Sequence, residues 1–454
     1  MPYATINPAT GKTEKVFPAH TPAEVDALLD RAVAAFAEYK TTTYAERSRH
    51  LVTAAELLEG EVPDVARILT TEMGKTFAAA KAEVSKCAVG LRWFAENSER
   101  LLADEDIPTK ATRSYVHYQP LGPVLAVMPW NFPLWQVIRF AGPALMVGNV
   151  GLLKHASNVP QTALALEDLF RRAGLPEGVF TTLLVESKDV AALIEDPRIV
   201  AVTLTGSERA GMSVAATAGH ALKKTVLELG GSDPFIVLAS ADLDAAVRTA
   251  VTARVQNNGQ SCIAAKRFIV VDSVYDDFLA RFTEGMDALV VGDPFDPATD
   301  VGPIVSEAQR DELVAQVEEA ERQGATVHRS PKAPDGAGWW FPPTVLSDVT
   351  TDMPFTQEEI FGPVATVLRV SDVDAAIAAA NATTFGLGSS VWTTDAGERA
   401  RCIEGIEAGA VFVNAMVAST PELPFGGIKR SGYGRELSEV GLKEFANTKT
   451  VWIA

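Results

Sequence analysis

The sequence predicts an α/β protein with two parallel-sheet domains and a small β arm. Three observations predict this fold class. Short apolar strands alternate with helices over much of the chain, a helical stretch precedes them, and two strand-like segments have no partner close in the sequence. Alternating strands and helices form a doubly wound parallel sheet. A length of 454 residues allows two or three domains.

The first elements are helical. Residues 22–103 carry apolar side chains at spacings of three and four, as in Val25, Leu28, Leu29 and Ala32, and contain no strand-like run. Residues 112–119 then alternate as a strand does and are followed by Pro120-Leu121-Gly122-Pro123, which stops the pattern. We therefore expect this strand to leave the body of the protein and to contact another subunit.

Strands and helices alternate after the arm. The pattern predicts strands at 124–128, 150–153, 181–185 and 200–204, and helices at 133–146, 161–173, 188–194 and 207–218. Short apolar strands separated by helices are typical of a parallel sheet, which binds ligands at the carboxyl ends of its strands. A nucleotide cofactor is the first hypothesis for this half of the chain.

A second series of strands and helices follows. It begins with a strand at 235–238 and continues with a helix at 243–255, a strand at 268–271 and a helix at 275–289, which predicts a second α/β domain. Residues 331–338 are rich in Gly and Pro and predict a surface loop. The terminal segment 449–453 predicts a strand that needs a sheet edge elsewhere in the molecule.

Composition excludes several classes of function. Forty basic residues against fifty-eight acidic ones give a net charge of −18, which repels phosphate backbones and anionic membranes. The three cysteines, Cys87, Cys262 and Cys402, lie far apart and show neither disulfide nor metal-site spacing. The N-terminus lacks the pattern of a secretory signal. We therefore expect a cytoplasmic protein that binds no nucleic acid, no membrane and no metal.

Cys262 and Glu228 are the strongest candidates for catalytic residues. Cys262 ends the segment Asn257-Asn258-Gly259-Gln260-Ser261-Cys262, whose backbone N–H groups are expected to surround the sulfur and favour the reactive thiolate. Glu228 precedes Gly230 and Gly231, which leave room for a water beside the carboxylate. The pattern predicts a nucleophile and a base. The alternatives are a buried structural cysteine and a glutamate that only forms a salt bridge.

A cofactor site is predicted at two strand ends. Residues 205–211, Thr-Gly-Ser-Glu-Arg-Ala-Gly, follow a strand and open a helix, so free N–H groups there face a pyrophosphate. An ordinary strand–helix turn also explains this segment. Lys154 ends another strand, and Ser157 lies three residues later, where a carboxylate would accept the ribose hydroxyls of NAD. A serine leaves room for the 2′-phosphate, so the sequence favours NADP over NAD.

Seven motifs in order resemble the NAD(P)-dependent aldehyde dehydrogenase superfamily almost from end to end. The Glu228–Cys262 spacing of 34 residues agrees with that family. The motifs are Pro129-Trp130-Asn131-Phe132-Pro133, residues 154–157, Gly206-Ser207 with Gly211, Glu228-Leu229-Gly230-Gly231, Gly259-Gln260-Ser261-Cys262, Glu359-Ile360-Phe361-Gly362-Pro363 and Pro424-Phe425-Gly426-Gly427.

The resemblance implies a role for each matching residue. Cys262 is the nucleophile, Glu228 the general base, and Asn131, with the Cys262 N–H, the oxyanion hole. Asn131 alone is also explained as a turn former before a helix. The cofactor contacts implied are Trp130, Lys154, Ser157, Gly206, Ser207, Gly211, Leu229, Glu359 and Phe361.

The resemblance also implies a three-part subunit. Residues 1–103 and 121–229 form the dinucleotide-binding domain, residues 230–430 the catalytic domain, and residues 104–120 with 431–454 an oligomerisation arm. A homo-oligomer, either a dimer or a tetramer, follows from such an arm.

Arg139 indicates the substrate. It is the one charge in the apolar helix after Pro133 and lies four residues after Trp135, on the same helical face. An arginine at this position resembles the succinate-semialdehyde dehydrogenase branch, where it binds the distal carboxylate of the aldehyde as a fork. Ser419 and Phe425 fit the same branch as further substrate contacts. A helix-end arginine with no ligand is the alternative.

Three positions depart from that branch. Gln256 stands where some members carry a second arginine, which puts the strength of carboxylate binding in doubt. Ala264 stands where some carry a second cysteine, so no local disulfide switch is expected. His155 replaces the usual proline after the cofactor lysine, and the sequence does not indicate its effect.

Other functions stay open at this point. Another semialdehyde, such as glutarate semialdehyde, or a neutral aldehyde would need the same catalytic residues. A CoA-acylating enzyme typically lacks the glutamate base, so Glu228 argues against it. A structural or ligand-binding homologue without turnover would not need Cys262, Glu228 and Asn131 together.

Overall fold

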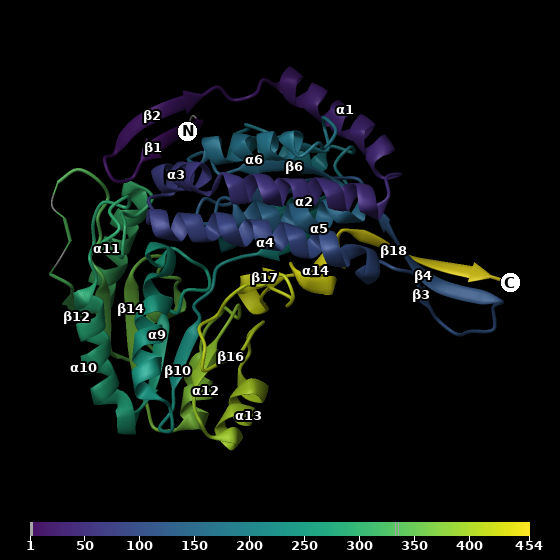
Figure 1. The fold of residues 1–454 in the computed structure, drawn as a ribbon. Coiled ribbons are helices and arrows are strands. Elements are labelled where there is room, and N and C mark those ends of the chain that lie inside the picture. The colour runs from purple at the N-terminus through teal and green to yellow at the C-terminus, as the bar shows by residue number, and fades with distance from the viewer. Residues whose placement is uncertain (1–2, 332, 335) are drawn as a thin grey trace.

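The computed structural model describes residues 3–331, 333–334 and 336–454. Two lobes and a protruding arm make up the molecule (Figure 1). The upper lobe holds the N-terminal helices and one sheet, the lower lobe holds a second sheet, and the C-terminus lies at the tip of the arm. The predicted α/β fold class with two parallel-sheet bodies is confirmed.

The upper sheet has six strands in the order β17-β9-β8-β5-β6-β7. All neighbours pair in parallel except β17, which runs antiparallel to β9. Strands β6 and β8 are buried along their whole length, and β5 is buried at every residue except Val127, because helices cover both faces of the sheet. The strands are β5 (Pro123–Met128), β6 (Val150–His155), β7 (Phe180–Thr182), β8 (Ala201–Thr205), β9 (Lys224–Glu228) and β17 (Gly432–Tyr433).

Helices surround this sheet. Thr21 and Thr43 start the first two helices with capping boxes, in which Glu24 and Glu46 return the hydrogen bond. Helix α4 packs along both α2 and α5, and α5 in turn packs on β5 and β6, so α4 lies one layer further from the sheet than α5. The helices are α1 (Pro22–Tyr39), α2 (Tyr44–Gly60), α3 (Val62–Met73), α4 (Phe77–Leu101), α5 (Trp135–Val147), α6 (Pro160–Arg172), η1 (Ser187–Asp189), α7 (Val190–Glu195) and α8 (Glu208–His220).

The lower sheet has seven strands in the order β12-β13-β14-β11-β10-β15-β16, of which only β12 runs antiparallel. The strands are β10 (Pro234–Val237), β11 (Arg267–Val271), β12 (Thr326–Arg329), β13 (Thr344–Val349), β14 (Val364–Val370), β15 (Ser390–Trp392) and β16 (Phe412–Val413). Its helices are α9 (Leu243–Val255), α10 (Asp272–Ala288), α11 (Glu307–Arg322), α12 (Val373–Asn381) and α13 (Ala396–Gly405), with short turns η2 (Gln256–Gly259), η3 (Pro354–Gln357) and η4 (Lys429–Ser431).

The arm joins two distant parts of the chain. Strand β18 (Ala446–Ile453) pairs antiparallel with β4 (Arg113–Pro120) over eight residues, and β3 (Glu105–Asp106) covers the other edge of β4. The two strand-like segments of the sequence are therefore each other's partners. Helix α14 (Ser438–Glu444) and β17 pack on the upper lobe. Of residues 431–454, only β18 thus belongs to the arm sheet; the domain boundaries otherwise stay a prediction.

Three local features differ from the predicted elements. The strand predicted at 181–185 ends at Thr182, because the Val185 N–H bonds to the Leu183 carbonyl and leaves the ladder. The helix predicted at 188–194 begins as the 3₁₀ turn η1. A hairpin of β1 (Tyr3–Asn7) and β2 (Lys12–Phe17) precedes the helices and was not predicted. Residues 332 and 335 of the predicted loop lie outside the described residues.

Within the described ranges, no helix is long and apolar enough to cross a membrane.

Candidate active site

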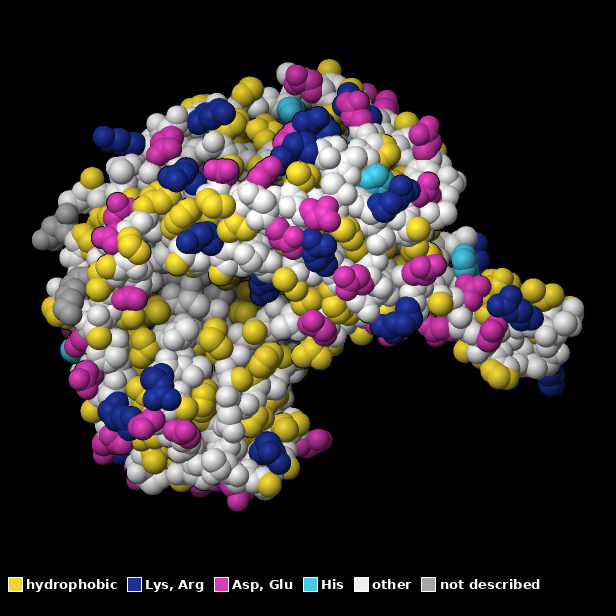
Figure 2. All heavy atoms as spheres, viewed as in Figure 1, with side chains coloured by type: hydrophobic (Ala, Val, Ile, Leu, Met, Phe, Trp, Pro, Cys, Tyr) yellow, Lys and Arg dark blue, Asp and Glu magenta, His cyan; other side chains and the backbone are white. Residues whose placement is uncertain are grey.

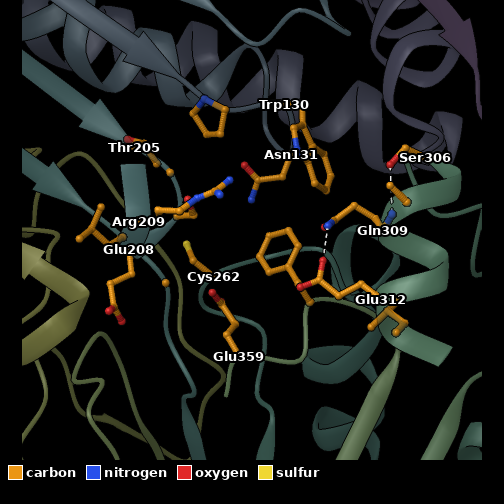
Figure 3. A pocket seen from close by; sticks show the side chains of 18 of the residues that line it. Trp130, Asn131, Thr205, Glu208, Arg209, Cys262, Ser306, Gln309, Glu312 and Glu359 are labelled. Atoms are coloured by element: carbon orange, nitrogen blue, oxygen red, sulfur yellow. Dashed lines mark hydrogen bonds between the residues drawn. The ribbon is translucent and has the colours of Figure 1, made fainter. Parts of the chain in front are cut away.

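A hollow separates the two lobes (Figure 2), and it contains a cavity of about 660 Å³. Asn131, Cys262 and Arg209 point into this cavity from three different elements, and α11 forms the opposite wall (Figure 3). The cavity brings together many of the residues predicted from the sequence. These are Trp130, Asn131, Gly206, Ser207, Leu229, Cys262, Glu359 and Phe361.

The loop before Cys262 has an unusual backbone. Asn257, Asn258 and Gly259 have φ values of 56°, 58° and 74°, the left-handed region that asparagine and glycine tolerate best. A Cβ on Gly259 would lie 2.4 Å from the carbonyl carbon of Gly362, so only glycine fits there. The Asn258 amide donates to the carbonyls of Gly74 and Pro303. These contacts fix the loop that presents the thiol.

Asn131 faces the same loop. Its Nδ2 donates one hydrogen bond to the Gln260 carbonyl at 3.2 Å, which leaves its second N–H for a ligand. Its own carbonyl accepts from Asn257 Nδ2 at 2.8 Å and from Lys75 Nζ at 2.9 Å. Asn131 is therefore held from both sides, as an oxyanion donor must be.

A buried ion pair supports this arrangement from behind. Lys75 and Glu83 are both fully buried and paired with each other. The other oxygen of Glu83 accepts from the N–H groups of Leu134 and Trp135 at 2.9 and 3.0 Å. Glu83 thus binds the free N–H groups at the start of α5.

Burial is the main influence on the pKa of Cys262, the predicted nucleophile. It raises the pKa of the Cys262 thiol to about 12, although the positive charges of Arg139 and Lys266 act to lower it. The expectation that backbone N–H groups favour the thiolate is therefore not supported, because burial is the largest influence on this pKa and it raises it. Lys266 lies next to the thiol and donates to the carbonyls of Ser261 and Cys262 at 2.8 and 2.7 Å.

Glu228 is the last residue of β9, and its side chain is buried. Both of its oxygens are buried and have no hydrogen-bond partner in the described part of the chain. Burial, and next the charge of Glu436, raise the pKa of Glu228 well above its usual range. A Cβ on Gly426 would lie 2.6 Å from Glu228 Oε1, so glycine is required beside the carboxyl group. The neutral acid is thus favoured at rest, and its ionised form is a strong base.

The predicted substrate residues form two contacting pairs, and each pair has one residue on α5. Trp135 Nε1 donates to Ser419 Oγ at 3.0 Å. The Arg139 guanidinium stacks 4.5 Å from the centre of the Phe425 ring. Arg139 is only 2% exposed, and its Nε lies 2.7 Å from Glu436 Oε2. That pair is misaligned for a hydrogen bond, and Arg139 Nη2 has no partner among the described residues.

The predicted cofactor residues occupy two regions. Ser207 caps α8 through the Ala210 N–H and lines the cavity, so the helix N-terminus opens into it. A Cβ on Gly211 would lie 2.6 Å from Leu229 Cδ1, so this glycine lets α8 pack on the end of β9. Glu359 accepts from the Gly231 N–H at 3.1 Å, and Phe361 meets Trp130 edge to face at 5.7 Å.

Lys154 and Ser157 lie outside that cavity, at the end of β6. Lys154 is 6% exposed, and burial lowers its pKa. Among the described residues it forms no ion pair, so its ammonium has no carboxylate to neutralise it. A phosphate would do so. These residues fit NADP.

His155, whose effect the sequence did not indicate, links β6 to the Asn131 loop. Its Nε2 lies 2.8 Å from the Pro133 carbonyl, which only accepts, and its Nδ1 lies 2.9 Å from the Ala156 N–H, which only donates. The ring is therefore the neutral tautomer with hydrogen on Nε2. Burial lowers the pKa of His155 to about 4.

This pKa predicts a loss of stability in acid. The imidazole of His155 takes up a proton near pH 6.5 in the unfolded chain but only near pH 4 in the folded protein. Its contribution to the free energy of unfolding is therefore complete above about pH 6.5 and falls as the pH drops towards 4. The full difference is roughly 3 kcal/mol. We expect the stability difference between wild type and His155→Gln, measured by urea unfolding, to shrink from pH 7 to pH 4.5. A constant difference would contradict the neutral, bonded ring.

Several residues of the site were missed by the sequence analysis. Lys266, Glu436 and Lys86 all lie beside predicted catalytic or substrate residues. Only Lys86 had a local signal, since it lies three residues after Glu83 on a largely apolar helix. The other two lie in loops or beside strands, where the sequence does not show which groups meet. Cys87 and Cys402 are buried and free.

Comparisons with known proteins agree with this geometry. The aldehyde dehydrogenase family model matches residues 1–451. The succinate-semialdehyde dehydrogenase [NADP(+)] of Mycobacterium avium is 61% identical over 100% of this chain and 97% of that protein. The succinate-semialdehyde dehydrogenase [NADP(+)] 1 of Mycobacterium tuberculosis is also 61% identical and covered completely. The crystal structure of the Streptococcus pyogenes succinic semialdehyde dehydrogenase with NADP⁺ is 38% identical, with a TM-score of 0.97 over 99% of each chain.

Proposed function

The chain belongs to the aldehyde dehydrogenase family, and from that membership we propose that it oxidises succinate semialdehyde to succinate with NADP as the oxidant. The observation that carries the substrate is Arg139. It is a buried cation whose Nη2 has no partner among the described residues, and its positive charge acts to lower the pKa of Cys262. A carboxylate at the far end of the aldehyde supplies the missing acceptor. The resemblance noted in the sequence is confirmed at the level of the family.

Cys262 and Asn131 carry the first step. Cys262 loses its proton, and Sγ adds to the aldehyde carbon, so that negative charge develops on the former carbonyl oxygen. The free N–H of Asn131 donates to this oxygen, and one such donor contributes about 3 kcal/mol. The raised pKa of Cys262 means that the bound ligands and the nearby cations must favour the thiolate before this step.

Bound NADP would supply the hydride acceptor, and loss of the hydride from this carbon would leave an acyl thioester on Cys262. Lys154 and Ser157 would hold its 2′-phosphate, the α8 N-terminus with Ser207 its pyrophosphate, and Glu359 the ribose near the thiol. Glu228, once ionised, removes a proton from a water that attacks the thioester. Succinate then leaves, and Cys262 is restored.

The remaining proposals concern the assembly and its location. Trp452 and Ile453 on β18 are 56% and 46% exposed, and β18 is the edge strand of the arm. An exposed apolar edge strand favours pairing with another subunit, which supports a homo-oligomer. Three free cysteines support a reducing compartment such as the cytoplasm.

Steady-state kinetics with two aldehydes and two cofactors test the substrate and the cofactor together. The aldehydes are succinate semialdehyde and its methyl ester, which has the same carbon chain without the negative charge. We expect the highest kcat/KM for the acid with NADP. Equal values for acid and ester would remove the carboxylate assignment, and a preference for NAD would remove the cofactor assignment.

The variant Ser157→Glu tests the predicted preference for NADP. A carboxylate at this position repels the 2′-phosphate, so kcat/KM with NADP should fall by about tenfold or more. The value with NAD is the internal control and should fall much less. An equal loss with both cofactors would mean that the variant damages the fold rather than phosphate binding.

A further inference from the structure

Lys86 lies beside the predicted substrate residues without belonging to any motif. It projects from α4 towards α5, and its Nζ donates to Ser419 Oγ at 2.9 Å. The ammonium also lies 4.5 Å from the centre of the Trp135 ring. Its charge interacts with those of Arg139 and Cys262. Lys86 is therefore part of the same cluster as Arg139.

This lysine is a half-buried cation with no acid to neutralise it. Among the described residues no carboxylate lies within ion-pair distance, and Glu83, the carboxylate whose charge it feels, is already paired with Lys75. Burial first, and then the like charge of Arg139, lower the pKa of Lys86 to about 8. Glu436 lies beside Arg139 only, so the two like charges still repel each other, and an anion bound by both cations would remove that penalty.

The hydrogen bonds of Ser419 leave a third donor in the cluster. Its oxygen accepts from Trp135 Nε1 and from Lys86 Nζ, which occupies both lone pairs. The hydroxyl hydrogen is therefore free to donate. Together with the remaining N–H groups of Lys86 and with Arg139 Nη2, this hydroxyl gives the cluster three groups that can donate, and Glu436 beside Arg139 is the acceptor nearby. A site of this kind binds an anion that accepts several hydrogen bonds, as a carboxylate does.

We propose that Lys86 binds the distal carboxylate of the aldehyde directly, together with Ser419 and Arg139, and thereby sets the preference for an acidic aldehyde. The inference rests on the proposed function, since it assigns a second cation to the same substrate group. Arg139 is partly engaged by Glu436, whereas Lys86 has only a neutral partner. Lys86 is therefore the cation that a substrate carboxylate neutralises most completely.

Lys86→Met tests this directly, because methionine keeps the length and apolar stem of the side chain without the charge. We expect kcat/KM for succinate semialdehyde to fall by about 10- to 100-fold, mainly through KM, as for one lost charged hydrogen bond. The methyl ester should change less than about twofold. Lys86→Arg should restore most of the loss. Lys81→Met, on the exposed face of the same helix, should leave both substrates unchanged.

The outcomes separate this inference from the proposed function. A wild type that does not prefer the acid over the ester overturns the proposed function itself. If the wild type prefers the acid and the Lys86→Met variant keeps the same preference, only the proposed role of Lys86 is overturned. Equal losses on acid and ester would also overturn it, because a purely structural residue affects both substrates.

Discussion

Replacing Cys262 by alanine is expected to abolish aldehyde oxidation, with a loss of at least about 10⁴-fold in kcat. The thiol forms the bond on which every later step depends, and Cys262 is the only cysteine among the described residues that line the cavity. NADPH formation monitored by absorbance at saturating substrate measures the effect. Cys402→Ala is the matched control, since Cys402 is a free cysteine too but lies on α13 in the lower lobe. Its activity should be close to that of the wild type.

Glu228→Gln distinguishes the two halves of the reaction in the same assay. The amide cannot deprotonate water, so the thioester should form and then persist. We expect a burst of NADPH of about one equivalent per active site, followed by very slow turnover. Full steady-state turnover in this variant would show that another group activates the water. Residual turnover of Cys262→Ala near the wild-type level would remove the covalent mechanism altogether.

Replacing Glu83 by leucine is expected to destabilise the protein by about 3–5 kcal/mol in free energy of unfolding. Lys75 would keep a buried charge without its partner, and the N–H groups of Leu134 and Trp135 would lose their acceptor. The Asn131 carbonyl would remain the only acceptor for Lys75. Urea unfolding followed by circular dichroism measures the loss.

Glu59→Ala provides the comparison on the surface. Glu59 on α2 forms a two-bond ion pair with Arg92, which lies on α4 as Glu83 does, but this pair is largely exposed and screened by solvent. Its removal should change stability far less than Glu83→Leu. Similar losses from the two variants would contradict the view that burial makes the Lys75–Glu83 pair essential.

Much of the fold followed from local patterns. The helix predicted at 243–255 has the same bounds as α9, and most strands of the upper sheet agree within a few residues. Period and length identify such elements because one or both faces are buried. The hairpin β1–β2 was missed because its second strand is almost wholly exposed and has no apolar alternation. Strand β7 was predicted too long because a local turn, invisible in the pattern, withdraws Val185 from the ladder.

The chemical identities of the site were determined by the sequence. Cys262, Glu228 and Asn131 stand in motifs whose glycines and order admit few other families, and the family is confirmed. Their individual roles stay predictions until the variants are measured. The sequence also placed Arg139 next to Trp135 on one helical face, because a spacing of four is fixed by the geometry of the helix.

Only the tertiary structure decided which charges are neutralised and which are not. Glu83 is paired with Lys75, and Glu436 lies next to Arg139. Lys86 donates to Ser419, a residue 333 positions away in the sequence. The same holds for the Cys262 thiol, whose pKa burial raises although the charges of Arg139 and Lys266 act to lower it. Burial and distances between remote segments set these properties, since the energy of a charge depends on the solvent it loses and the partners it meets. Local sequence patterns show neither the burial of a side chain nor its distance from remote segments.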